Sequence, residues 1–308
     1  MNNLIIDEVD IYAAYSIFVA EGGYDGIVAY PALKTVSYND WPEEDGVEPD
    51  LENPKLASKE FSIIFNSRNK QLIGNFLDLI SNGAYHDFTF PELGITRRLR
   101  LLKNQNSKYI SNIERFTLSF ADDFPLGGYD YQEPIGSALI KQTGYSLDDR
   151  DLSEYGLFVA EGSDAEIMKM PAIKRNLITD NSVIDGLIYD PENVFFQSKD
   201  VSLKLCARAT DIAAFWRNYS AFLYDLVRPE ERLLYFGRVD EEFPCYYKSS
   251  SVREFRIING EVWCDFNLVL VFTSFRLGGI DYLLAAEDGS LIITEDGLYY
   301  IDLGIYGS

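Results

Sequence analysis

The stretch YSIFVAEGGYDGIVAYPALK, from Tyr15 to Lys34, returns later in the chain as YGLFVAEGSDAEIMKMPAIK, from Tyr155 to Lys174. The two stretches align without a gap at an offset of 140 residues, and ten of their twenty positions are identical. Self-similarity at a fixed spacing is the sequence sign of a structural unit that a chain uses more than once. We therefore expect one kind of domain, used twice in tandem.

The similarity continues beyond these two stretches. Ser58–Ser62 (SKEFS) matches Ser198–Ser202 (SKDVS) at the same offset, and the offset is 151 where Leu126–Tyr131 (LGGYDY) meets Leu277–Tyr282 (LGGIDY). An insertion of about eleven residues late in the second copy accounts for the increase. The predicted organisation is a first domain over residues 1–128, a linker over 129–151, a second domain over 152–279, and a C-terminal β-hairpin or meander over 280–308.

Each copy has the same predicted order of elements. Apolar residues first alternate with others along a strand, which is the period of a half-buried β-strand. A helix with one apolar stripe follows in each copy, around Phe76 in the first and around Phe215 and Phe222 in the second, and two or three further strands come after it. The predicted fold class is mainly β (α+β): two tandem β-sandwich or barrel domains, each with one packed helix, and a short C-terminal meander.

The composition of the chain narrows the classes of function. Its 308 residues are 47% hydrophobic and 14% aromatic, which is enough for two buried cores. The formal charge of −22, from 49 acids and 27 bases, should repel the phosphate backbone, so a conventional nucleic-acid binder is disfavoured. Acids stand where a signal peptide would have bases, and no run approaches a membrane span of roughly twenty apolar residues, so we expect a cytoplasmic protein without membrane contact.

The sequence predicts no catalytic, cofactor-binding or metal-binding residues. His86 is the one histidine, and no GxSxG, P-loop, GxGxxG after a strand, or CxxC spacing is present. A base near neutral pH beside a nucleophile or metal is what most hydrolytic and transfer enzymes need. We therefore expect a protein that is not an enzyme, with a carboxylate-dependent hydrolase as a remaining alternative because carboxylates are abundant.

Two charged regions are candidates for function. An acidic loop in the first copy has seven acids among thirteen residues, with Pro42 and Pro49 breaking regular structure, and the second copy has a counterpart. A cluster of bases lies in the hairpin ITRRLRLLK, where the bases could contact acids of a neighbouring subunit. The acidic residues, as a possible channel or stacking loop, are Asp40, Glu43, Glu44, Asp45, Glu48, Asp50 and Glu52 in the first copy and Asp180, Asp185, Asp190 and Glu192 in the second; the possible interface residues are Arg97, Arg98, Arg100 and Lys103.

Four stretches follow one another in a recognisable order: SKEFSIIF (Ser58–Phe65), the helix through Phe76 and Leu79, FTFPELGITRRLRLL (Phe88–Leu102) and FTLSFADDFPL (Phe116–Leu126). This order of parts resembles the tail-tube fold of bacteriophages, especially the amino-terminal domain of distal tail (baseplate) proteins. The resemblance covers most of the chain, but copy two departs from it by its insertion and by lacking the Pro125 corner.

This resemblance implies a structural protein of a phage or prophage tail, either a distal tail or a baseplate hub-like component. Such domains associate side by side into a ring around a DNA channel, which also removes free sheet edges. With two copies per chain, a trimer would give a pseudo-six-fold ring, and a hexamer with one copy in the ring is the alternative. The expected partners are copies of the chain itself, other tail proteins, and DNA that passes without specific binding. The protein would be cytoplasmic during assembly and then part of the virion tail.

One further reading stays open beside the hydrolase. A glycan- or protein-binding β-sandwich module would use the 21 tyrosines and three tryptophans for stacking.

Overall fold

The computed structural model describes residues 4–20, 23–82, 85–104, 108–110, 113–175, 178–179, 182–183, 185–186, 188–189 and 194–276. The described residues up to Phe275 belong to one compact unit. The meander expected over 280–308 lies outside the described residues.

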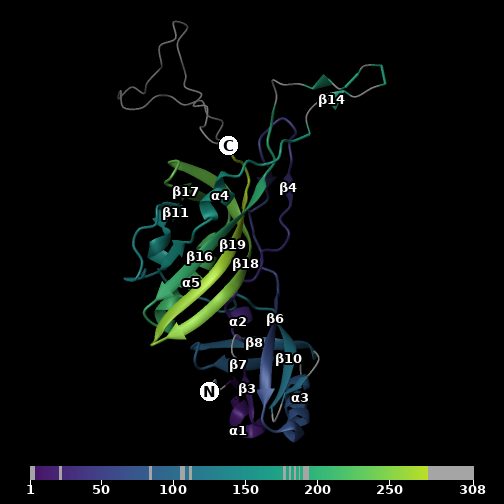
Figure 1. Cartoon of the computed structure of the whole chain (residues 1–308), viewed down its shortest axis with the longest axis vertical. Helices are drawn as coiled ribbons and strands as arrows, with labels where there is room; N and C mark the ends of the chain where they lie inside the picture. Colours follow the sequence, from purple (N-terminus) through teal and green to yellow (C-terminus); the bar gives the residue numbers. More distant parts are fainter. Residues whose placement is uncertain are drawn as a thin grey trace. The chain divides into compact units, whose positions relative to one another are not determined.

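The first half of the compact unit is built on one antiparallel sheet (Figure 1). Its strands lie in the order β2-β1-β7-β8-β10-β6-β3, and β9 pairs with β10 beside this path. The elements are β1 (Ile5–Ile6), β2 (Val9–Asp10), α1 (Ile11–Tyr15), β3 (Ile17–Val19), α2 (Asp25–Val28), β4 (Tyr38–Asn39), β5 (Glu48–Pro49), β6 (Lys59–Ser67), the 3-10 turn η1 (Lys70–Leu72), α3 (Ile73–Ser81), β7 (His86–Phe90), β8 (Ile95–Asn104), β9 (Lys108–Ile110) and β10 (Ile113–Asp122).

The second half contains a sheet with the order β12-β11-β17-β18-β19-β16-β13. Its elements are β11 (Tyr145–Leu147), β12 (Arg150–Asp151), the 3-10 turn η2 (Leu152–Tyr155), β13 (Leu157–Val159), α4 (Ser163–Met168), β14 (Ile178–Thr179), β15 (Ile188–Tyr189), β16 (Lys199–Ala209), α5 (Ile212–Leu226), β17 (Arg232–Phe236), β18 (Glu241–Ile258) and β19 (Glu261–Phe272). Apart from β9, this is the strand order of the first sheet. The predicted mainly β fold is confirmed.

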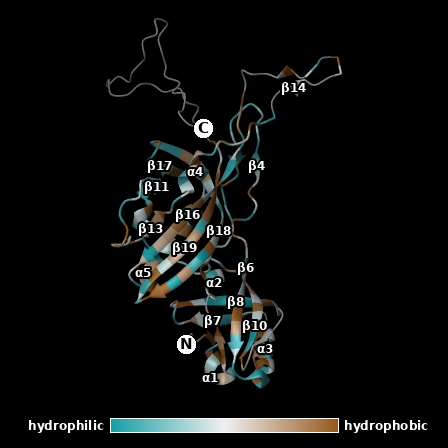
Figure 2. Cartoon of the chain, viewed as in Figure 1, coloured by the Kyte–Doolittle hydropathy of each residue, from teal (hydrophilic) through white to brown (hydrophobic). Residues whose placement is uncertain are grey.

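The two sheets also agree in register. Phe65 lies opposite Phe116 in the first sheet, and Leu205 lies opposite Phe266 in the second. Hydrophilic and hydrophobic bands follow one another along β18 and β19 (Figure 2). Burial alternates residue by residue from Glu242 to Lys248 and from Glu261 to Leu270, as expected where one sheet face is buried. The two strands at the centre of each sheet thus place equivalent residues in the core.

Both sheets carry a β-bulge at the same place. The register between β8 and β10 passes from Leu101 to Lys103, so that Leu102 has no partner in the ladder. The register between β18 and β19 passes from Tyr247 to Ser249 and leaves out Lys248 in the same way. A bulge turns the backbone groups of the extra residue away from the ladder, where they can bind another segment.

Helices α3 and α5 each pack on one face of the sheet in their half. In α3, Phe76 lies against Phe65 and Phe116, with ring centroids 5.5 and 6.2 Å apart. In α5, Tyr219 lies 5.4 Å from Phe266, the counterpart of Phe116. Helix α5 is the longer of the two, with 15 residues against nine in α3.

The insertion in the second half is divided between two places. The offset between matching residues is 140 at β6 and β16, but it is already 146 at His86 and Arg232, because the connection through α5 is longer. It reaches 150 where Phe116 matches Phe266, after the longer β18–β19 hairpin. The prediction of a single insertion late in the second copy is therefore wrong.

The second sheet also begins earlier than the sequence indicates. Residues 145–151 were expected in the linker, but they form β11 and β12, which pair as β1 and β2 do. The turns agree as well, since Asp7 and Glu8 have positive φ angles of 47° and 69°, and Asp148 and Asp149 have 48° and 68°. The repeated sheet therefore includes residues from Tyr145 onward. Whether residues 1–128 and 152–279 are separate domains stays a prediction.

The described residues contain no disulfide, no helix that could span a membrane and no cluster that could bind a metal ion. Cys206, Cys245 and Cys264 are free and buried. No helix within the described residues is long and apolar enough to cross a membrane. The described part of the chain holds no group of three or more His, Cys, Asp or Glu side chains that could bind a metal ion.

Candidate functional site

The acidic loop of the first half contacts the second half of the chain. It forms the end of a two-stranded arm, in which Tyr38 pairs with Pro49 and Asn39 with Glu48. The amide of Gly46 donates to the carbonyl of Phe196 at 2.7 Å, and the Asp45 carboxylate accepts from the amide of Phe196 at 2.8 Å. The loop is therefore attached to the second half by both its backbone and a carboxylate.

Gly46 is required at this contact for a steric reason. Its φ is +72°, and a Cβ atom would lie 1.6 Å from the carbonyl oxygen of Thr273. The next residue, Val47, donates its amide to that same oxygen at 2.9 Å. Only a residue without a side chain allows the loop to approach this closely.

The Asp40 carboxylate forms an ion pair in the same region. It lies 2.6 Å from Nζ of Lys174, whose side chain is 7% exposed and also donates to the Trp41 carbonyl at 2.7 Å. The remaining acids of the loop are exposed or half-buried; they are Glu43, Glu44, Glu48, Asp50 and Glu52, of which Glu48 accepts from Asn39 and Trp41 and Asp50 accepts from Ser37.

The acids of the second copy are described only in part. Asp185 is exposed, while Asp180, Asp190 and Glu192 lie outside the described residues. The arm itself is repeated, because Ile178 pairs with Tyr189 and Thr179 with Ile188.

The predicted interface arginines have three different surroundings. Arg97 is half-buried, with its guanidinium 5.8 Å from the ring centroid of Trp216 in the second half. Arg98 is exposed and lies over the ring of Tyr85. Arg100 binds Asp123 with two hydrogen bonds, from Nε at 2.9 Å and Nη2 at 3.2 Å, so its carboxylate partner is in its own chain. Of Lys103 only the backbone, in β8, is described.

The environment of His86 indicates a structural role. Its Nδ1 lies 2.5 Å from the carboxylate of Asp7, which also accepts from the amide of Asp87 at 2.9 Å. In the second half Arg232 donates to Asp148 at 2.8 Å, and Asp148 accepts from the amide of Leu233 at 2.9 Å. A contact that an arginine makes equally well requires only a hydrogen-bond donor.

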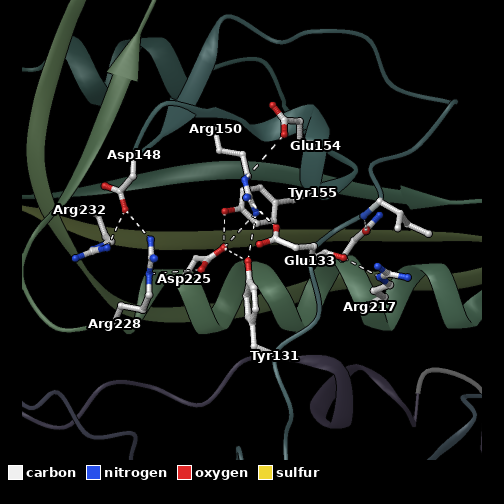
Figure 3. A network of polar contacts seen from close by, with 12 residues as sticks. Tyr131, Glu133, Asp148, Arg150, Glu154, Tyr155, Arg217, Asp225, Arg228 and Arg232 are labelled. Carbon is white, nitrogen blue, oxygen red and sulfur yellow. Dashed lines mark hydrogen bonds and ion pairs between the residues drawn. The ribbon is translucent and has the colours of Figure 1, made fainter.

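A polar cluster on α5 was not predicted. Asp225, which is 4% exposed, accepts from the hydroxyl groups of Tyr155 at 2.6 Å and Tyr131 at 3.1 Å (Figure 3). Arg150 donates to Tyr131 at 3.3 Å and to Glu133 at 2.8 Å. The cluster lines a cleft of about 490 Å³.

The contacts of this cluster indicate a structural role. Burial and the hydrogen bond to Asp225 raise the pKa of Tyr155, so its hydroxyl group stays a donor. Arg228 and Arg232 both contact Asp148, which ties the end of α5 to the β11–β12 turn (Figure 3). Each of these charges has a partner of opposite sign within the chain, so the cluster holds the expected linker segment and the β11–β12 hairpin against α5.

The most extensive contact between the halves involves the segment after α2. Tyr30 is 5% exposed, and its ring is stacked on Tyr219 with centroids 4.1 Å apart. The hydroxyl group of Tyr30 donates to the carbonyl of Tyr219 at 2.6 Å. The hydroxyl group of Tyr247 donates to the carbonyl of Pro31 at 2.8 Å. The amide of Leu33 donates to the carbonyl of Lys248, the residue of the bulge, at 2.9 Å.

A second contact between the halves lies nearby. The indole Nε1 of Trp216 in α5 donates to the carbonyl of Leu93 at 2.6 Å, and Phe255 of β18 packs against the core of the first half. The sequence signal for these contacts was limited to apolar residues at Tyr30 and Leu33 within the repeat, which does not say what they touch.

Comparisons with known proteins add little to this description. No protein-family model and no curated protein matches the chain. One solved structure that aligns with it is titled as the crystal structure of the SPP1 Dit (gp 19.1) protein, a paradigm of hub adsorption apparatus in Gram-positive infecting phages. It shares 10% sequence identity over 88% of this chain and 98% of that chain, with a TM-score of 0.33. That score is too low to assign a fold or a function to this chain.

Proposed function

We propose that the chain is a structural component of a phage or prophage tail, either a distal tail or a baseplate hub-like protein, which acts by assembling with copies of itself and with other tail proteins. The observation that carries the proposal is the internal duplication. One sheet, with its bulge and its arm, is built twice, and the first copy docks on the second in a head-to-tail manner. Head-to-tail contacts between like units generate rings when the rotation closes.

The duplication gives two such sheets per chain. A trimer supplies six copies of the sheet and gives a pseudo-six-fold ring, and a hexamer that uses one copy per chain is the alternative. The two sheets of one chain stay separate, and their outer strands β2, β3, β12 and β13 have two or three residues each. Such short edges offer little backbone for pairing, so docking segments are better placed than sheet edges to join the units.

The charge of the chain supports a passage for DNA without retention. At a formal charge of −22, an acidic channel wall would repel phosphates, whereas each Lys or Arg contact would hold them. The acids that the first-half arm leaves exposed, such as Glu43 and Glu44, are candidates for this wall. Arg98 is the candidate among the bases for a contact with another subunit, because it is exposed.

Electron microscopy of the purified chain tests the proposal. We expect closed rings with a central opening, and light scattering of the same sample should give the mass of three or six chains. Isolated particles of one chain at every concentration would contradict it. A reversal of charge at Arg98 (R98E) should weaken the ring, and an unchanged mass at matched salt would remove that residue from the interface.

The glycan-binding alternative has one observation in its favour. Tyr38 and Trp41 on the first arm are 57% and 50% exposed, and aromatic rings of this kind stack on sugars. Retention on immobilised glycans that is lost in Y38A and W41A, from a protein that stays monomeric, would favour this alternative over the ring.

A further inference from the structure

The docking contact between the two halves has a counterpart in each half that makes no such contact among the described residues. The contact consists of a docking segment on the first half, Tyr30–Leu33, and a receiving surface on the second half, at the bulge of β18 and at α5. Because the fold is duplicated, the second half has its own docking segment and the first half has its own receiving surface.

The docking segment of the second half is exposed. At the offset of 140, Tyr30 corresponds to Met170 and Leu33 to Ile173. Tyr30 is 5% exposed, whereas Met170 and Ile173 are each 52% exposed. The backbone is held in the same way in both halves, since Leu33 forms a bridge with Leu56 and Ile173 forms one with Phe196. The second segment is therefore prepared in the docked geometry but has no occupant among the described residues.

The arms show the same asymmetry. Gly186 is the counterpart of Gly46 and has a similar backbone, with φ of +84° against +72°. A Cβ atom on Gly46 would collide with Thr273, but one on Gly186 would meet nothing within 4 Å. The second arm thus has the glycine that close docking requires, without a docked neighbour among the described residues.

The receiving surface of the first half lies at the β8 bulge. Leu102 stands where Lys248 stands in the second half, and it is likewise the residue without a ladder partner. A second receiving group is Lys34, the counterpart of Lys174. Lys174 is 7% exposed and paired with Asp40, whereas Lys34 is exposed.

We infer that the segment Met170–Ile173 and the second arm at Gly186 dock on the first half of another copy of this chain, at the β8 bulge and Lys34. This inference rests on the proposed self-assembly and specifies the surface that carries it. The occupant is a second copy because the equivalent surface, on the second half of the chain, receives the equivalent segment within one chain. Repetition of one contact within and between chains places all sheets in a single head-to-tail series.

Cysteine cross-linking tests the geometry directly. A backbone hydrogen bond between Leu33 and Lys248 brings two residues near the separation that a disulfide spans, so L33C/K248C should cross-link within one chain and serves as the positive control. The pair I173C/L102C should cross-link between chains. A mixture of single variants I173C and L102C should give covalent dimers, whereas each single variant alone should not. The three native cysteines are buried and should not interfere.

Substitution of the exposed docking residues provides the second test. The variant M170D/I173D should fold normally, because both side chains are exposed, and should raise the apparent dissociation constant of the assembly by roughly tenfold or more. I258D, at a side chain that is 49% exposed on the β18–β19 hairpin, is the matched control and should assemble as the original chain does. K34E, on the receiving side, should weaken assembly, with K141E at another exposed lysine as its control.

The outcomes separate the two proposals. If the original chain assembles but M170D/I173D assembles equally well and I173C/L102C forms no link between chains, the docking surface is wrong while self-assembly stands. If the original chain is a monomer at all concentrations, both the docking surface and the proposed ring are wrong. Links between chains accompanied by weakened assembly of M170D/I173D would support both.

Discussion

Arg232 occupies in the second sheet the place that His86 occupies in the first. Each lies at the start of the strand that pairs with the N-terminal hairpin of its sheet, and each contacts the carboxylate of the hairpin turn, Asp148 or Asp7. The same carboxylate accepts an amide of the next strand residue in both halves. The duplication therefore extends to individual polar contacts, and it explains the single histidine as part of the scaffold.

The Asp148 carboxylate should be important for stability. In D148N the guanidinium of Arg232, which is buried, loses its charged partner, and the free energy of unfolding should fall by about 2 kcal/mol. Urea denaturation followed by fluorescence measures this change. D149N, at the adjacent turn residue, is the control, because asparagine tolerates a positive φ and Asp149 makes no contact with Arg232 among the described residues. Equal stability of D148N and D149N would contradict the assignment.

The contact between Tyr30 and Tyr219 should hold the two halves together. Y30A removes a buried ring, which should cost about 3–5 kcal/mol, whereas Y30F removes only the hydrogen bond to Tyr219 and should cost about 1 kcal/mol. Y38A, at a ring that is 57% exposed, is the control and should change little. A similar effect of Y30A and Y38A in thermal unfolding would show that the Tyr30 contact is absent in solution.

The Arg100–Asp123 pair should contribute to acid sensitivity. Hydrogen bonds from Arg100 and Ser58 hold the pKa of Asp123 well below its usual range. A depressed pKa gives stability that is present above about pH 4 and is lost as the pH falls below that value. D123N should therefore flatten the acid limb of the stability curve, while D87N, at an exposed carboxylate, should leave it unchanged. An acid limb that is identical in all three proteins would contradict this role.

The lysines behind α2 and α4 should make stability depend on pH in a higher range than Asp123 does. Lys59 donates to the carbonyl of Ile27, and Lys199 contacts the carbonyl of Ile167. Burial lowers the pKa of Lys59 to about 7 and that of Lys199 to about 8.

From about pH 7 to about pH 8.5 the unfolded chain therefore holds more protons at Lys59 and Lys199, and the free energy of unfolding should rise with pH. K59M/K199M should flatten this rise, measured by urea denaturation across the range, and K141M, at an exposed lysine, should keep it. A slope that is the same in all three proteins would show that the two lysines are solvated.

Docking of the acidic loop should depend on Gly46. G46A would place a methyl group against the Thr273 carbonyl, so the loop should detach while both sheets stay folded. Hydrogen exchange at the amides of Val47 and Phe196, which are bonded in the docked loop, should accelerate. In G186A, the matched variant in open space, these amides should exchange at the original rate. Unchanged exchange in G46A would mean that the loop does not dock.

The sequence predicted the repeat and the strand period well, because both depend on local patterns of apolar residues. It missed the early start of the second sheet, since the turn residues Asp7 and Glu8 match Asp148 and Asp149 at an offset of 141, beside a stretch of low similarity. The residue of the second half that corresponds to His86 was missed for a similar reason. This residue, Arg232, lies six residues beyond the position that the offset of 140 gives, because the connection through α5 is longer.

The contacts of the acidic loop could not have been read from the chain. Composition indicated an exposed loop, whereas one glycine and one carboxylate, Gly46 and Asp45, attach it to Phe196 of the second half. The same limit applies to Arg100, whose in-chain partner Asp123 lies at the end of β10. Contacts of this kind depend on which segments the fold brings together, and periodicity carries no information about them.

The claim that the chain assembles through a repeated head-to-tail contact is tested most directly by native mass spectrometry over a range of concentrations. The account predicts a discrete species of three chains or six chains for the original protein, and its loss in M170D/I173D but not in I258D. A single chain of 35.1 kDa at every concentration would contradict it.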